Sequence, residues 1–150
     1  MQLRKYLDFV VNVKAVPQSR PRGTAAGGFI RFYKPSNNKE YEKIISDTAL
    51  DVMLEYGISK PTELPVHLDV VVIKRPPDSW SNWRKKQACD KEILPVVKPD
   101  VSNYYKLVED ALNKVVYEDD SQVITHSGGK FYGKEDLVIV EVSVYDGVRA

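Results

Sequence analysis

The sequence has little of several residue types, and each scarcity excludes a class of protein. One cysteine, Cys89, cannot form an internal disulfide or a cluster of cysteine ligands. The two histidines, His67 and His126, are isolated and give no indication of a zinc site. No apolar run is long enough to span a membrane, and no charged-then-apolar leader marks secretion. We therefore expect a cytoplasmic protein with no membrane partner.

The net charge is also small, which excludes a general electrostatic attraction to nucleic acid. It is only +1, but the charges are segregated along the chain. Residues 1–43 carry nine Lys or Arg and three acids (+6), and residues 74–98 carry seven and three (+4). Residues 99–120 carry two and six (−4). An acidic segment in the same chain as strongly basic ones is typical of a metal site beside a phosphate-binding surface.

Length and hydrophobic periodicity predict one α/β (α+β) domain, spanning residues 1–150, with a mixed sheet packed by two main helices. At 150 residues and 43% hydrophobic, the chain can bury a proper core. Expected strands are 9–16, 66–73 (central, because nearly all apolar), 122–131 and 137–145, and a hairpin turns at Gly27-Gly28. Expected helices run from Asn37 or Asn38 to about Tyr56, over 80–86 with Asp78 or Ser79 as cap, and over 102–114.

The helix expected at 102–114 is the most informative element. Its apolar residues recur at the spacing of a buried stripe: Tyr104, Leu107, Val108, Ala111, Leu112 and Val115. A polar stripe lies beside it, formed by Asn103, Lys106, Asp110 and Asn113. Asp100 stands at the entrance, after an extended run at 93–97 and Lys98-Pro99. We expect these polar groups at the edge of a cleft.

An acidic pair, Asp119-Asp120, follows this helix and precedes the next strand. If the chain folds back there, Asp119 or Asp120 meets Asp100. Carboxylates that converge repel one another unless a cation compensates, and oxygen ligands are what magnesium prefers for phosphate chemistry. The pattern therefore indicates a metal-dependent nuclease.

Each of these residues also has a structural explanation. Asp100 or Ser102 is a plausible helix cap. Lys106 and Asp110 stand four residues apart, the spacing of a solvated ion pair that contributes only about 0.3–0.5 kcal/mol. Asp119-Asp120-Ser121 has ordinary turn composition. Only their ordered combination favours the catalytic interpretation.

The same residues resemble the hallmark of a known family, the RusA Holliday junction resolvases of bacteria and their prophages. That hallmark is Lys-Pro-Asp-x-Asp-Asn-x-x-Lys, then Asp-Ala-Leu-Asn, then an aromatic residue shortly before Asp-Asp-Ser-Gln-Val. The matching residues are Lys98, Pro99, Asp100, Asn103, Lys106, Asp110, Ala111, Leu112, Asn113, Tyr117, Asp119, Asp120, Ser121, Gln122 and Val123. Residues 17–22 (PQSRPR), 77–81 (PDSWS) and 84–86 (RKK) are similar to flanking family segments.

The resemblance implies an endodeoxyribonuclease that uses Mg²⁺, with Mn²⁺ as the alternative metal. It implies a homodimer that resolves four-way junctions by paired symmetric nicks in DNA recombination and repair. Asp100, Lys106 and Asp120 then form the catalytic set, and Asn103 and Asp110 support it. The metal ligands are drawn from Asp100, Asp120, Asp119 and Ser102. Lys106 is the candidate ammonium for the phosphate or the leaving oxygen.

Ser102 is the one important departure, because the family has an aspartate there. A serine can touch a cation or cap a helix, but it adds no negative charge. Three interpretations stay open: Asp100, Asp120 and water hold the metal; Asp119 or Asp110 substitutes; or the protein binds branched DNA and cuts it weakly or not at all. A nuclease for other branched DNA, such as flaps or forks, is a further alternative.

Two basic groups are candidate DNA contacts, and the alternative for each is a solvated surface. The first surrounds the Gly27-Gly28 tip, and the second ends the helix expected at 80–86 and adjoins the acidic motif. The candidates are Arg20, Arg22, Arg31, Lys34, Arg84, Lys85, Lys86 and Lys98.

Overall fold

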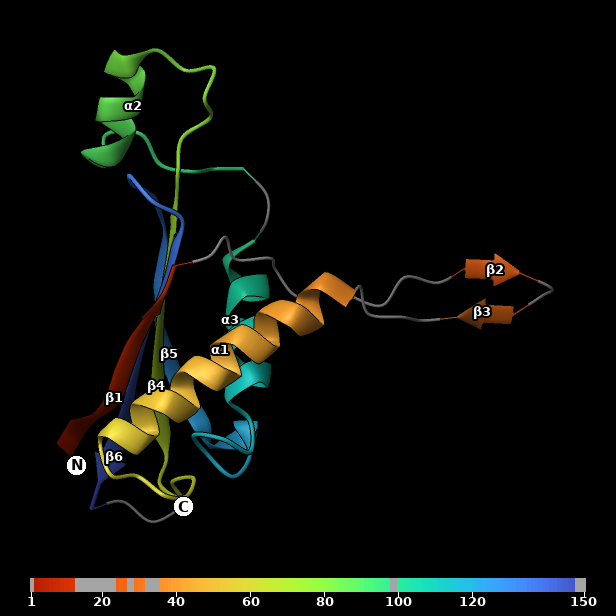
Figure 1. Ribbon diagram of the computed structural model, residues 1–150, viewed down its shortest axis with the longest axis vertical. Helices are drawn as coiled ribbons and strands as arrows, with labels where there is room; N and C mark the ends of the chain where they lie inside the picture. The colour runs from red at the N-terminus through yellow and green to blue at the C-terminus, as the bar shows by residue number, and fades with distance from the viewer. Residues whose placement is uncertain (1, 13–23, 27–28, 32–35, 98–99, 148–150) are drawn as a thin grey trace.

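The structure is a computed structural model that describes residues 2–12, 24–26, 29–31, 36–97 and 100–147. Figure 1 shows a sheet with helices packed along it and a third helix beyond one end. In chain order the elements are β1 (Gln2–Val11), β2 (Thr24–Ala26), β3 (Phe29–Arg31), α1 (Ser36–Glu55), β4 (Val66–Lys74), α2 (Asn82–Cys89), α3 (Val101–Leu112), the 3₁₀ turn η1 (Asp120–Gln122), β5 (Val123–Tyr132) and β6 (Leu137–Asp146). The expected α+β class, with two main helices on a mixed sheet, is confirmed.

The main sheet has four strands in the order β1-β6-β4-β5. β4 is parallel to β5, and the other two pairings are antiparallel. A parallel pair needs a crossover connection, and here the crossover carries α2, α3 and η1. β4 is therefore an interior strand, as its apolar sequence predicts. The segment with the acidic motif is fastened at both ends to neighbouring strands.

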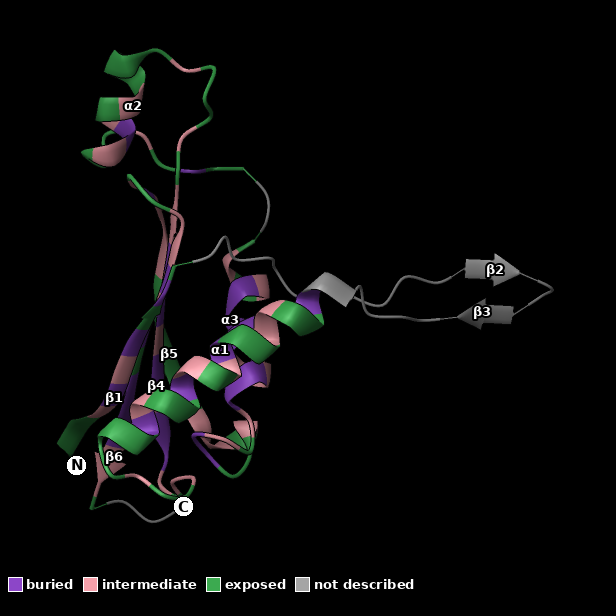
Figure 2. Cartoon of the chain, viewed as in Figure 1, coloured by how far each residue is buried: buried purple, intermediate pink, exposed green. Residues whose placement is uncertain are grey.

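The core lies where α1 and α3 pack against the sheet and each other. α1 contacts β1 and α3, and α3 contacts β4. Side chains of β4 alternate between buried and half-buried, as a strand covered on one face requires. The apolar stripe of α3 is buried as predicted except for Val115, which is half-buried beyond the helix end. Figure 2 shows the buried positions of both helices and the sheet in purple.

Among the described residues, no helix is both long and apolar enough to cross a bilayer.

Four expected elements differ from the observed ones. α1 begins at Ser36, so Asn37 and Asn38 lie inside the helix instead of capping it. β1 begins at Gln2 instead of residue 9, and residues 13–16 lie outside the described part. Its first half is polar because those side chains are exposed, so an apolar signal could not reveal it. α2 begins at Asn82, with Ser81 as its cap in place of Asp78 or Ser79, since Ser81 Oγ accepts from Arg84 N at 3.2 Å.

The extended run expected at 93–97 forms no strand; it is a loop joining α2 to α3. Pro95 lacks the N–H that a ladder needs, and Val96 is 93% exposed, so this apolar run has no sheet to enter. Two contacts hold the loop to β5: Lys130 Nζ donates to Val97 O at 2.5 Å, and Lys91 Nζ lies 4.9 Å from the centroid of the Phe131 ring. The expected hairpin is present, since β2 pairs antiparallel with β3 around residues 27–28, which lie outside the described part.

Candidate active site

Asp100 occupies the N-cap position of α3, yet its carboxylate makes no capping bond. Its backbone is extended (φ −68°, ψ 146°), and the side chain is exposed. The alternative in which Asp100 caps the helix through its side chain is therefore wrong. Ser102, in the first turn, is also exposed. Both side chains stand at the solvent-facing entrance of α3, where the chain arrives from α2.

Lys106 and Asp110 form the ion pair that their spacing allows, with Nζ 3.0 Å from Oδ1. Their side chains are 54% and 23% exposed, so the pair is weakly stabilising, about 0.3–0.5 kcal/mol. The hydrogen bond to Asp110 raises the pKa of Lys106, and the carboxylate of Asp120 raises it further. Lys106 is thus a firmly protonated ammonium in a negative surrounding.

The two adjacent aspartates after α3 have different roles. Asp119 is the N-cap of η1: its Oδ2 accepts from Ser121 N at 3.1 Å and from the Ser121 hydroxyl. These bonds lower the pKa of Asp119. Gln122 completes a capping box by accepting from Asp119 N at 2.9 Å. Asp119 is therefore engaged in the turn that its composition predicts.

Asp120 is half-buried and takes no part in this capping box. The turn that carries it is anchored twice. Gln122 Nε2 donates to Thr62 O and Leu64 O at 2.9 and 3.0 Å, and the buried Tyr117 donates its hydroxyl to Glu109 O at 2.8 Å. The Gln122 bonds hold the turn to the segment before β4, and the Tyr117 bond holds the chain after α3 to that helix. In this position the Asp120 carboxylate raises the pKa of both Lys106 and Glu109.

Glu109 is a candidate that the sequence analysis missed. It is half-buried on α3, and burial raises its pKa, as do the neighbouring Asp120 and Asp110 carboxylates, while Lys106 and His126 act in the opposite direction. The spacing of the residues along α3 could have identified Glu109. Glu109 follows Lys106 by three residues and Ser102 by seven, so all three share one helical face.

The structure does not join all the residues that the sequence predicts to meet. Lys106 pairs with Asp110, and the Asp120 and Glu109 carboxylates lie close enough to raise the pKa of Lys106. No hydrogen bond or ion pair between described residues joins Asp100 to Asp119 or Asp120. Within the described ranges, no three His, Cys, Asp or Glu side chains are grouped as metal ligands. Convergence of Asp100 and Asp120 on one cation stays a prediction.

The other predicted side chains fall into three groups. Asn103 is half-buried in the first turn of α3. Arg84 stacks on Trp80, with its guanidinium carbon 3.8 Å from the ring centroid, and Trp80 in turn meets Tyr132 edge to face at 5.5 Å. Lys85 is half-buried and Lys86 is exposed, both on α2. Arg20, Arg22, Lys34, Lys98 and the side chain of Arg31 lie outside the described part.

Comparison with known proteins decides the family. The sequence profile described as endodeoxyribonuclease RusA matches residues 12–144. The chain belongs to the RusA family. It is also similar to YqaN of Bacillus subtilis (strain 168), an uncharacterized protein, with 38% identity over 142 residues that cover 91% of this chain and 97% of YqaN. The RusA match includes α2, α3 and η1, and therefore the whole acidic motif. The predicted resemblance is confirmed, and it places the chain among endodeoxyribonucleases.

Proposed function

We propose that this RusA-family protein is a magnesium-dependent endonuclease that resolves four-way DNA junctions by paired symmetric nicks. The observation that supports it best is that Lys106 and Asp120, from separate elements of one crossover, lie close enough for the Asp120 carboxylate to raise the pKa of Lys106, which is held in place by its ion pair with Asp110. A lysine ammonium held beside a carboxylate on an accessible helix face is suited to phosphate chemistry. The matched family supplies the reaction class.

The donor set fits a hard divalent ion. Magnesium is commonly held by one or two carboxylates and several waters, so it needs no cage of three protein ligands. Asp120 and Asp100 are the proposed ligands, and when bound the ion would supply charge stabilisation and an activated water. Asp119 is a weaker candidate, because its carboxylate already accepts two bonds from Ser121.

Glu109 is the proposed replacement for the negative charge absent at Ser102. Of the two substitutes that the sequence indicates, Asp119 caps a turn and Asp110 is paired with Lys106. Glu109 lies two helical turns beyond Ser102 on the same face, within the influence of Asp120. Its half-buried carboxylate, destabilised by neighbouring negative charge, would gain from a nearby cation.

Lys106 is proposed to neutralise charge that develops on the phosphate or the leaving oxygen. Its raised pKa keeps it protonated at neutral pH. Phosphodiester hydrolysis needs on the order of 20 kcal/mol of barrier lowering, so a fixed ammonium acts together with metal and positioning. Asp110 would hold the ammonium in place through the 3.0 Å ion pair.

The direct test is cleavage of a labelled mobile four-way junction in magnesium, with a chelator as control. We expect paired nicks in magnesium and binding without cleavage in the chelator. Flaps and forks in the same assay test the choice of substrate. Binding with no cleavage in magnesium or manganese would favour the second candidate, a branched-DNA-binding protein, which Ser102 specifically supports.

A further inference from the structure

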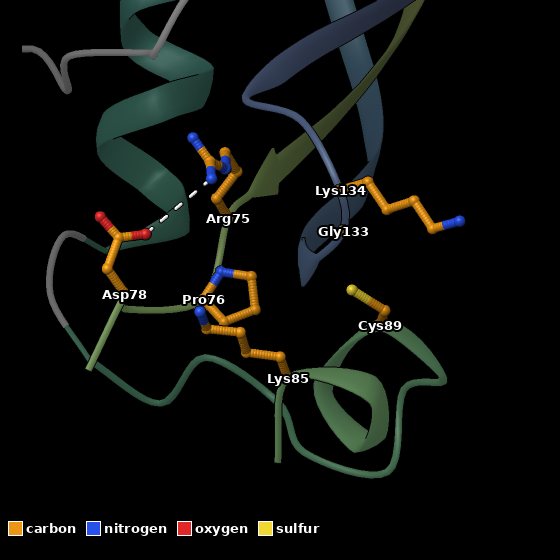
Figure 3. A pocket seen from close by; sticks show the side chains of 7 residues that line it. All are labelled: Arg75, Pro76, Asp78, Lys85, Cys89, Gly133 and Lys134. Atoms are coloured by element: carbon orange, nitrogen blue, oxygen red, sulfur yellow. Dashed lines mark ion pairs between the residues drawn. The ribbon is translucent and has the colours of Figure 1, made fainter. Parts of the chain in front are cut away.

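A hollow lies at the far end of the sheet from the C-terminal end of α3, where β4 leaves the sheet and α2 packs (Figures 1 and 3). Its volume is about 200 Å³. Three segments form its wall: the chain after β4, the α2 helix and the turn between β5 and β6. The lining residues are Arg75, Pro76, Asp78, Lys85, Cys89, Gly133 and Lys134.

The hollow is built into the fold. Lys85 and Cys89 stand four residues apart on α2 and so share one face, and the buried Ala88 anchors that helix. Gly133 N donates to Lys74 O at 2.9 Å, and a Cβ at Gly133 would overlap the Ile73 side chain. Arg75 N donates to Asp136 Oδ1 at 2.9 Å, which fixes the opposite wall.

Its charge is positive. Three cationic side chains, Arg75, Lys85 and Lys134, line it with the Asp78 carboxylate, and a second carboxylate, Asp136, lies at its edge, where it accepts from Arg75 N. The Asp78 carboxylate is 92% exposed and only loosely paired, with Arg75 Nη2 3.9 Å from Oδ1. Figure 3 shows these cations on three different segments, with the Arg75 guanidinium turned toward Asp78 and the Lys134 side chain extending away from the Lys85 ammonium. The lining therefore carries more positive than negative charge, which attracts an oxyanion into the hollow.

We propose that this pocket binds a backbone phosphate of a DNA arm, away from the phosphate that is cut. The proposal rests on the DNA-directed function proposed above and adds a second anchoring point to it. The chain runs from α2 through the loop 90–97 into the entrance of α3, so a duplex held at α2 lies on the approach to Asp100 (Figure 1). Phosphate contacts position a protein on a duplex without reading its sequence.

Cys89 provides a reporter, because it is the single cysteine of the chain, lines the pocket and is half-buried. The experiment measures the rate of Cys89 alkylation in a chelator, with and without a saturating four-way junction. We expect the junction to slow alkylation about tenfold or more and added salt to restore the rate. Inorganic phosphate at matched ionic strength is the second arm. Protection by that ion and none by DNA would overturn the proposal.

Variants that remove one positive charge test whether the charge of the pocket is responsible for junction binding. Lys85→Gln and Lys134→Gln should each weaken junction binding about tenfold and reduce its logarithmic salt slope by about one, whereas Lys60→Gln, an exposed lysine outside the pocket, should change neither. Unchanged alkylation in a complex that a gel shift shows to be formed, or pocket variants that behave like Lys60→Gln, would overturn the pocket and leave the nuclease proposal standing. A wild-type protein that binds no DNA would overturn both.

Discussion

The adjacent aspartates Asp119 and Asp120 have different roles. Asp119 accepts bonds that close the η1 turn, whereas Asp120 acts on Lys106 and Glu109. Composition could not separate them, because both fit a turn and both fit a metal site. The difference comes from the 3₁₀ turn, which directs one carboxylate to its own backbone and leaves the other beside α3.

Asp120→Asn is therefore expected to lower junction nicking about a hundredfold or more, since a cation site contributes several kcal/mol to the transition state. Asp119→Asn should leave nicking nearly unchanged, because asparagine also serves as an N-cap. Single-turnover nicking rates at saturating protein compare the two. Equal losses would contradict the division of roles.

Glu109→Gln should also lower nicking if this carboxylate supplies the charge that Ser102 lacks. The loss is expected to be about tenfold to a hundredfold, and Ser102→Asp in the same protein should restore most of it, because the two positions share one face of α3. Glu118→Gln, an exposed acid beside the motif, is the matched control. Full activity of the Glu109 variant would remove it from the site.

At the scale of elements, β5 and α3 meet through a glycine. Gly128 has φ +118°, and a Cβ there would overlap the carbonyl oxygen of Val70 and lie 2.8 Å from the Tyr105 hydroxyl. That hydroxyl donates to Ser127 O. Only glycine allows the edge strand to sit this close to both β4 and α3.

Gly128→Ala is expected to lower the free energy of unfolding by more than about 2 kcal/mol, because steric overlap adds to the strain of a positive φ. Gly57→Ala serves as control: its φ is +73°, but nothing lies within 4 Å of the added carbon. It should lose only about 1 kcal/mol. Urea unfolding gives both values, and similar losses would show that the close approach is unimportant.

The C-terminal end of α1 is attached to β1 through Asp8. Its carboxylate accepts from Lys5 Nζ at 2.9 Å and from the Tyr56 hydroxyl at 3.1 Å. Mainly through the bond to Lys5, and further through Tyr56, these contacts lower the pKa of Asp8 from its ordinary value of 3.8.

Because the folded pKa of Asp8 is depressed, its contribution to stability is present above the unfolded value and is lost as pH falls through the folded one. The contribution is small, since the carboxylate is 41% exposed. The difference in unfolding free energy between wild type and Asp8→Asn should therefore shrink as pH falls below about 4. A difference that grows with acid would contradict the assignment.

The sequence predicted those elements whose apolar residues repeat at a clear period, namely α3, α1, β4, β5 and β6. The prediction failed where solvent exposure or tertiary contacts, and not the local sequence, determine whether a strand forms. The first half of β1 is exposed and carries no apolar signal, and residues 93–97 have the composition of a strand but lack a partner. For the site, periodicity placed Lys106 and Asp110 on one face correctly. It gave Glu109 no role, because its burial depends on the segment that folds back after α3.

For the whole molecule, a four-way junction presents two equivalent strands, and one site per chain calls for a two-fold homodimer. We expect sedimentation equilibrium at micromolar concentration to give twice the mass of 17.1 kDa. If the basic segments contact phosphates as proposed, junction binding should weaken steeply with salt. A monomer that still cuts both strands of one junction in a single encounter would contradict this arrangement.

The strand order β1-β6-β4-β5 also bears on when the protein becomes active during its synthesis. β6 is the last strand to be made, yet it lies between β1 and β4, and no two strands of this sheet made before β5 are neighbours. A growing polypeptide therefore exposes α3 with its acidic side chains before there is a scaffold to hold them in place. We therefore expect the proposed site to form only once β6 has joined β1 to β4.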